Sequence, residues 1–71
     1  MAVREFTAGA EYRLRQDLEI RKKSNGVMTD FFRKGTVLKV RKVEADKEQL
    51  WFEGVSEPLA MDVLARLVDP A

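Results

Sequence analysis

The chain has 71 residues and contains neither cysteine nor histidine. Without cysteine it has no disulfides or thiolate ligands, and without histidine it lacks the commonest general base and the imidazole ligand that zinc prefers. These absences remove most metalloenzyme and nucleophilic chemistry, so we expect a non-enzymatic protein that uses no cofactor. A chain of this length forms one domain with a compact core.

Long apolar runs are also missing. No segment approaches the roughly 18 apolar residues of a membrane span, and Arg4 and Glu5 interrupt the N-terminal stretch where a signal peptide would need an apolar run. The sequence therefore predicts a soluble, cytoplasmic protein. We expect a flexible segment over residues 1–8, followed by a single domain over residues 9–71.

The two charge signs are segregated along the chain. Residues 1–42 hold eleven Lys or Arg against five Asp or Glu, and residues 43–71 hold two against seven, although the net charge of the chain is only +1. This asymmetry predicts a polarised surface that meets an anionic partner or pairs head to tail with a second copy. The alternative is a fold that mixes the two halves into an even surface.

Alternation of apolar and polar residues predicts several strands. In Tyr12–Arg21, "YRLRQDLEIR", the apolar residues fall on one side and only Gln16 breaks the pattern, so we predict one half-buried strand. Asn25 and Gly26 predict a tight turn, because both residues tolerate positive φ. The chain then returns through a strand over residues 27–32.

Two further strands follow in the sequence. Residues 36–44, "TVLKVRKVE", alternate until a break that predicts a β-bulge near the end of the strand. Residues 49–54, "QLWFEG", place Leu50 and Phe52 on one face and Trp51, the only tryptophan, on the other. The opposite register, with Trp51 in the core and Phe52 outside, requires one bulge and remains an alternative.

The tail "PLAMDVLARLVD" has two interpretations. Its apolar residues fit a helix of about ten residues, but they also fit a short strand over residues 59–61, a 3₁₀ turn over 62–65 and a closing strand over 66–68. We favour the second, because a last strand beside the first one removes unpaired sheet edges. The predicted core consists of Tyr12, Leu14, Leu18, Ile20, Leu38, Val40, Leu50, Phe52, Leu64 and Leu67.

The order of these elements resembles that of SH3-like barrels, especially the bacterial and phage types, over about residues 9–69. The resemblance is carried by "EYRLRQDL", the long hairpin loop "EIRKKSNGVMTDFF", "FRKGTVLKV", "QLWFEG" and "PLAMDVLARLV". It implies an all-β fold, namely a five-stranded SH3-like barrel with a short 3₁₀ turn before the last strand. The tail lacks the Pro and Tyr of the eukaryotic proline-rich-peptide groove, so the resemblance implies other partners, such as proteins or nucleic acids.

Two binding functions are compatible with this fold. The first is binding of another protein, or of a second copy, through large side chains on the outer face, since such residues are common interface anchors. Its candidate residues are Trp51, Val37, Phe31 and Tyr12. The alternative is nucleic-acid binding through a basic strip. Its candidates are Arg13, Arg15, Lys22, Lys23, Arg33, Lys34, Lys39 and Arg41, which can equally be ordinary solvated strand residues.

Overall fold

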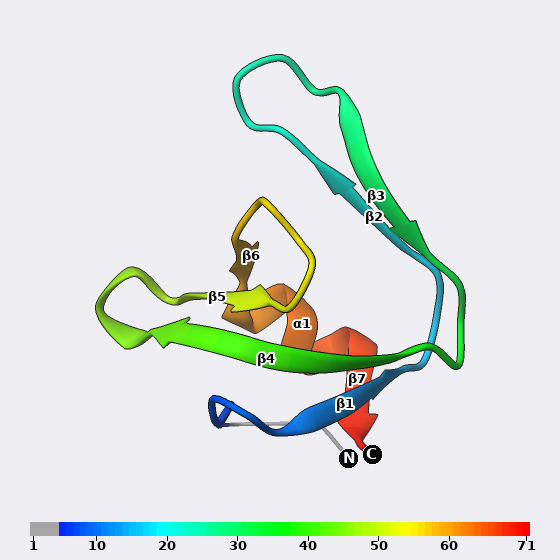
Figure 1. The fold of residues 1–71 in the computed structure, drawn as a ribbon, viewed down its shortest axis with the longest axis vertical. Coiled ribbons are helices and arrows are strands. Elements are labelled where there is room, and N and C mark those ends of the chain that lie inside the picture. Colours follow the sequence, from blue (N-terminus) through cyan, green and yellow to red (C-terminus); the bar gives the residue numbers. More distant parts are fainter. Residues whose placement is uncertain (1–4) are drawn as a thin grey trace.

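The computed structural model describes residues 5–71 and consists mainly of β-strands (Figure 1). Seven strands, one 3₁₀ turn and one short helix follow each other along the chain. They are β1 (Glu11–Leu14), β2 (Leu18–Arg21), β3 (Met28–Phe32), β4 (Val37–Glu44), η1 (Ala45–Lys47), β5 (Gln49–Phe52), β6 (Leu59–Ala60), α1 (Met61–Leu67) and β7 (Val68–Pro70). Within residues 5–71, no helix has the length and apolar character needed to cross a membrane.

Five of the strands form one antiparallel sheet in the order β6-β5-β4-β1-β7, and β2 and β3 form a separate two-stranded sheet. β7 lies beside β1, with Val68 opposite Leu14. The predicted return of the last strand to the first is therefore confirmed. The two sheets are not closed into a barrel. A small β-rich domain is thus confirmed, and the five-stranded SH3-like barrel stays a prediction.

The prediction of one continuous strand over Tyr12–Arg21 is wrong. The chain bends between Leu14 and Leu18, and the two halves join different sheets. Leu14 donates its backbone N–H to Thr36 and accepts from that of Gly35, so the turn before β4 holds this end of β1. Leu14 and Leu18 on either side of the bend are both buried and lie an even number of residues apart, which is why the periodicity conceals the bend, whereas Gln16 between them is exposed.

The C-terminal region combines both interpretations of the tail. α1 is an α-helix of seven residues, so the predicted 3₁₀ turn over residues 62–65 is wrong, and the closing strand begins at Val68 rather than at Arg66. Leu64 and Val68 are both fully buried. The helix forms its backbone hydrogen bonds within itself and places Leu64 in the core. The chain after it still reaches the edge of the main sheet and pairs with β1.

The core contains every predicted residue except Leu67, which is half-buried and packs against it. Phe6, Val55 and Val68 are buried as well and were not predicted. Phe6 packs on Tyr12 with 5.0 Å between the ring centroids. The predicted flexible segment over residues 1–8 lies partly outside the described residues, and its flexibility stays a prediction.

Candidate functional site

Trp51 lies on the outer face of the main sheet. Its neighbours Leu50 and Phe52 are completely buried, whereas Trp51 is half-buried and faces Lys42 across the strand pair. The outward register is therefore confirmed. The predicted bulge in β4 is confirmed too, because the pairing shifts between Val40 and Lys42.

The bulge surrounds Trp51 with polar groups. It leaves Arg41 as the extra residue of β4, and the Arg41 guanidinium lies 5.4 Å from the centroid of the Trp51 ring. The indole N–H donates to Glu44 Oε1 at 2.8 Å, and the Gln49 side-chain amide donates to the same oxygen at 2.8 Å. Because the indole N–H is already hydrogen-bonded to Glu44 and the Arg41 guanidinium lies over the ring, Trp51 is less available to contact a partner than its exposure alone suggests.

Glu44 is the electrostatic centre of this cluster. The hydrogen bonds from Trp51 and Gln49, together with the nearby ammonium groups of Lys42 and Lys47, lower the pKa of Glu44 from 4.5 to about 2. The two ammonium groups lie 4.0 and 3.7 Å from Glu44 Oε2. Both effects favour the ionised carboxylate. Glu44 therefore remains charged at neutral pH and holds the indole against the end of the sheet.

The other predicted protein-binding residues do not join Trp51 in one patch. Tyr12 is only 4% exposed, and its hydroxyl accepts a hydrogen bond from the Thr7 backbone N–H. Val37 is exposed, but it lies at the first position of β4, whereas Trp51 pairs near the far end of that strand. Phe31 is exposed on β3, in the other sheet.

The predicted basic residues are all exposed, but they do not form one uninterrupted strip. Arg15 contacts Asp69 at 3.7 Å and also donates to the Arg66 carbonyl, and Lys39 contacts Glu53 at 3.7 Å. The acidic neighbours come from the second half of the chain, so the fold mixes the two charge signs over the main sheet. Clusters of cations without such acidic contacts, in the part of the chain described, remain at Lys22–Lys23 and Arg33–Lys34.

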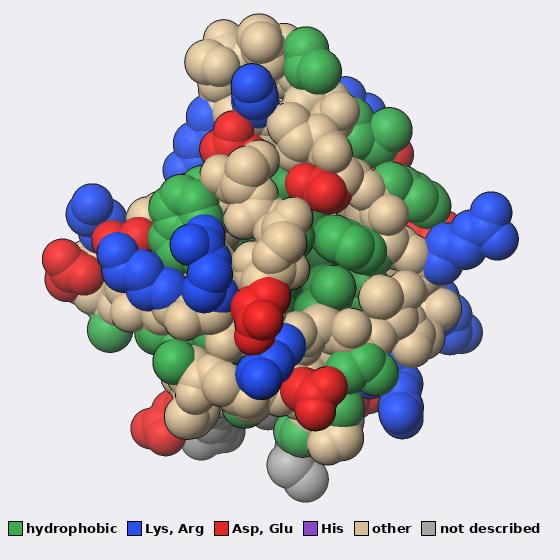
Figure 2. All heavy atoms as spheres, in the orientation of Figure 1, with side chains coloured by type: hydrophobic (Ala, Val, Ile, Leu, Met, Phe, Trp, Pro, Cys, Tyr) green, Lys and Arg blue, Asp and Glu red, His purple; other side chains and the backbone are tan. Residues whose placement is uncertain are grey.

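The β2–β3 hairpin, which we call the ribbon, projects away from the main sheet (Figure 1). It carries three of the large hydrophobic side chains that are exposed among residues 5–71. Val27 is 55% exposed, Met28 46% and Phe31 47%, and we call these three residues the ribbon surface. Figure 2 shows hydrophobic side chains at the molecular surface along the β3 side of the ribbon. Phe31 was among the contact residues predicted from the sequence, whereas Val27 and Met28 were not.

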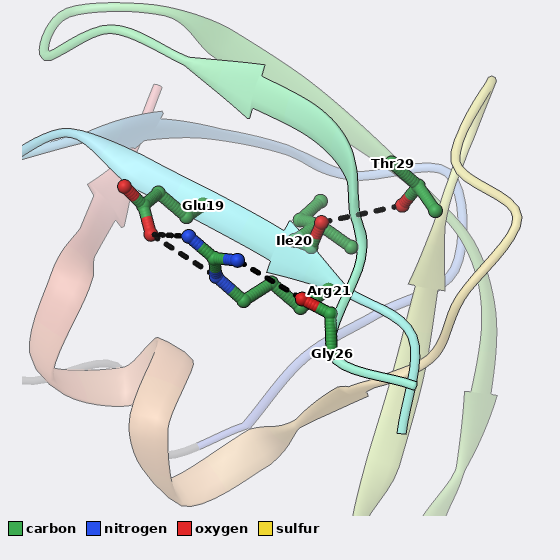
Figure 3. Close-up of polar contacts among 5 residues, drawn as sticks. All are labelled: Glu19, Ile20, Arg21, Gly26 and Thr29. Carbon is green, nitrogen blue, oxygen red and sulfur yellow. Dashed lines mark hydrogen bonds and ion pairs between the residues drawn. The ribbon is translucent and has the colours of Figure 1, made fainter. Parts of the chain in front are cut away.

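Arg21 links strand β2 to the loop at the tip of the ribbon through hydrogen bonds (Figure 3). Its guanidinium donates to Glu19 Oε2 through Nε at 3.3 Å and through Nη2 at 3.1 Å, and Nη1 donates to the Gly26 carbonyl at 2.9 Å. A register shift follows Ile20, whose carbonyl accepts from the Thr29 hydroxyl at 3.3 Å. The strand and the loop beyond it are thus held by one side chain.

The loop at the tip of the ribbon is also ordered by its own hydrogen bonds. The Lys22 N–H donates to the Val27 carbonyl at 3.0 Å, and the Gly26 N–H donates to the Lys22 carbonyl at 2.9 Å. Asn25 Oδ1 accepts from the Val27 N–H at 3.0 Å, and Gly26 takes a φ of 72°. The turn predicted from Asn25 and Gly26 is confirmed. A preformed loop loses little entropy when a partner binds.

Comparison of the chain with protein-family models, with curated proteins and with solved structures finds no match. The described residues enclose no pocket and contain no group of acidic residues arranged to hold a metal ion. The functional interpretation therefore depends on the surface, and the ribbon surface is its most distinctive part.

Proposed function

We propose that this domain is a non-enzymatic protein-binding module and that the ribbon is its binding element. The observation that carries the proposal is the ribbon surface, where Val27, Met28 and Phe31 are exposed together on a projecting hairpin. Exposed apolar clusters on small soluble domains mark interaction sites, because covering them removes apolar area from water. Hydrogen bonds of Arg21 and Asn25 support the proposal by holding the ribbon in one shape before binding.

Two broader expectations remain part of the proposal. The return of β7 beside β1 and the order of the strands support an SH3-like architecture. The absence of long apolar runs in the sequence supports a cytoplasmic location. Nucleic-acid binding is supported less well, because acidic side chains lie within 3.7 Å of Arg15 and Lys39, two members of the predicted basic strip.

Site-specific photo-crosslinking in cells of the source organism tests the proposal. A photoreactive phenylalanine analogue replaces Phe31 in one variant and Val63, an exposed residue of α1, in the matched control. We expect protein adducts from position 31, absent from position 63 and reproduced with the purified partner. Adducts that disappear on nuclease treatment, or equal adducts from both positions, would overturn the proposal.

A further inference from the structure

The outer edge of β3 is an unpaired strand edge in the described part of the chain. The edges of the main sheet are short, because β6 has two residues and follows Pro58, and β7 has three and ends at Pro70. β3 has five residues and no proline, and no strand of the described chain pairs with its outer edge. Natural proteins usually shorten, charge or cover such an edge, since its unpaired N–H and C=O groups accept a further strand.

The side chains on β3 favour apolar residues in an added strand. Residues opposite each other in neighbouring strands lie about 5 Å apart, so a strand beside β3 would contact Met28 and Phe31 directly. A strand on the β2 side would instead meet Glu19 and Arg21, whose charges already pair with each other at 3.1 Å. Met28 and Phe31 are three residues apart, but the register shift after Ile20 gives them partners in β2 that are only two residues apart, so both lie on the same face. A strand that pairs with β3 in the same way would need apolar residues at every second position.

Both ends of the ribbon are basic. Residues 18–34 contain five Lys or Arg against two Asp or Glu, a net charge of +3. Lys22 and Lys23 lie at the tip, and Arg33 and Lys34 follow the end of β3. Among residues 5–71, no ion pair involves these four cations. A ligand strand along β3 would therefore gain from acidic residues at both of its ends.

We propose that the partner contributes an extended segment of about nine residues, with alternating apolar residues in the middle and acidic residues at both ends, which adds as a third strand to β3. This inference rests on the proposed function and specifies its ligand. The length follows from the five residues of β3, which span about 17 Å at roughly 3.3 Å per residue, plus two flanking residues at each end.

Charge also argues against a second copy of this chain as the occupant. Asp30 lies at the centre of β3, so antiparallel pairing of two β3 strands would bring two Asp30 side chains near each other. The same pairing would bring the basic tip of one ribbon to the basic base of the other. Like charges at opposed positions destabilise strand pairing, whereas acidic flanks on a different chain complement it.

Selection from a random library of twelve-residue peptides against the purified full chain tests this proposal. We expect selected peptides with alternating apolar residues between acidic flanks, and slower hydrogen exchange of β3 amides when a synthetic copy is bound. The charge requirement is tested with Lys22→Ser/Lys23→Ser and with the matched control Arg13→Ser/Lys39→Ser, which removes the same charge from exposed positions of the main sheet. At about 50 mM salt, the first variant should bind about tenfold more weakly and the second less than twofold.

Several results would overturn strand addition. One is the selection of peptides whose apolar residues have helical spacing. Another is an equal loss of affinity in the two charge variants, and a third is an unchanged affinity after the backbone of every second peptide residue is N-methylated. A wild-type dimer in solution that dissociates when Phe31→Ser is introduced would identify a second copy as the occupant instead. If no peptide is selected while position 31 still crosslinks to a protein, strand addition fails and the proposed function stands. If position 31 crosslinks to no protein, the proposed function fails as well.

Discussion

Phe6 should contribute to stability as a core residue, although it precedes the domain boundary predicted at Gly9. It is 8% exposed and its ring packs on the buried ring of Tyr12. Truncation of a buried phenylalanine to alanine typically costs 3–5 kcal/mol. Because Phe6 is near the edge of the core, we expect Phe6→Ala to lower the free energy of unfolding by about 3 kcal/mol. A chain of this length has a total stability of about 4–10 kcal/mol, so the loss is a large fraction.

Urea unfolding monitored by the fluorescence of Trp51 and by circular dichroism measures this loss. In each of two matched controls, another phenylalanine with a different degree of burial is replaced by alanine. Phe52→Ala removes a completely buried ring and should cost about 4–5 kcal/mol, whereas Phe31→Ala removes a ring that is 47% exposed and should cost less than about 1 kcal/mol. In a thermal scan, 3 kcal/mol corresponds to a Tm lower by roughly 15 °C.

The test depends on the order of the unfolding free energies of the three variants. If Phe6→Ala unfolds at the same urea concentration as Phe31→Ala, the ring of Phe6 contributes nothing to the core. The domain would then begin at Gly9, as the sequence predicts. If Phe6→Ala lies between the two controls, the core includes the segment before Gly9.

Three further predictions concern polar groups and the backbone. The pKa of Glu44 is about 2 in the folded chain and ordinarily 4.5, so the stability that its charge contributes is complete above about pH 4.5 and is lost as the pH falls towards 2. The Glu44→Gln variant should not show this acid-dependent loss of stability. Equal acid sensitivity of the wild type and the variant in urea unfolding would contradict the prediction. Glu48 has a φ of 54°, so Glu48→Gly should raise the unfolding free energy by about 0.5–1 kcal/mol, and a lower thermal midpoint would argue against strain there. Asp17 Oδ1 accepts from the Lys34 N–H at 2.8 Å, so Asp17→Ala should cost about 1 kcal/mol and speed hydrogen exchange of that amide, whereas an unchanged exchange rate would show that the bond is not formed in solution.

Alternation along the strands was enough to predict most of the residues that face the core, although Phe6, Val55 and Val68 were missed. It correctly orients Leu50, Trp51 and Phe52, because successive side chains of a strand point to opposite faces whatever the strand packs against. The bulge in β4 was also predictable. Val40 and Val43 both face the core side, and an odd spacing between them requires one extra residue in the strand.

Contacts between distant residues decided the features that the sequence concealed. The bend at Gln16 leaves Leu14 and Leu18 buried on the same side, and the end of β1 before it is held by hydrogen bonds between the backbone of Leu14 and that of Gly35 and Thr36. The short helix α1 forms where Leu64 must enter the core, which local apolar spacing alone cannot distinguish from a 3₁₀ turn.

For the candidate site, too, some properties follow from the sequence and others only from the tertiary structure. The sequence by itself determined that the chain is β-rich and that Phe31 lies on a returning hairpin strand, and it favoured the outward register of Trp51 over the inward one, because these properties depend on periodicity within a few residues. Only the tertiary structure decided that Trp51 is bonded to Glu44 and that Met28 and Phe31 lie on an open strand edge. The physical reason is that exposure and pairing are relations between elements, set by which strands become neighbours after the chain has bent.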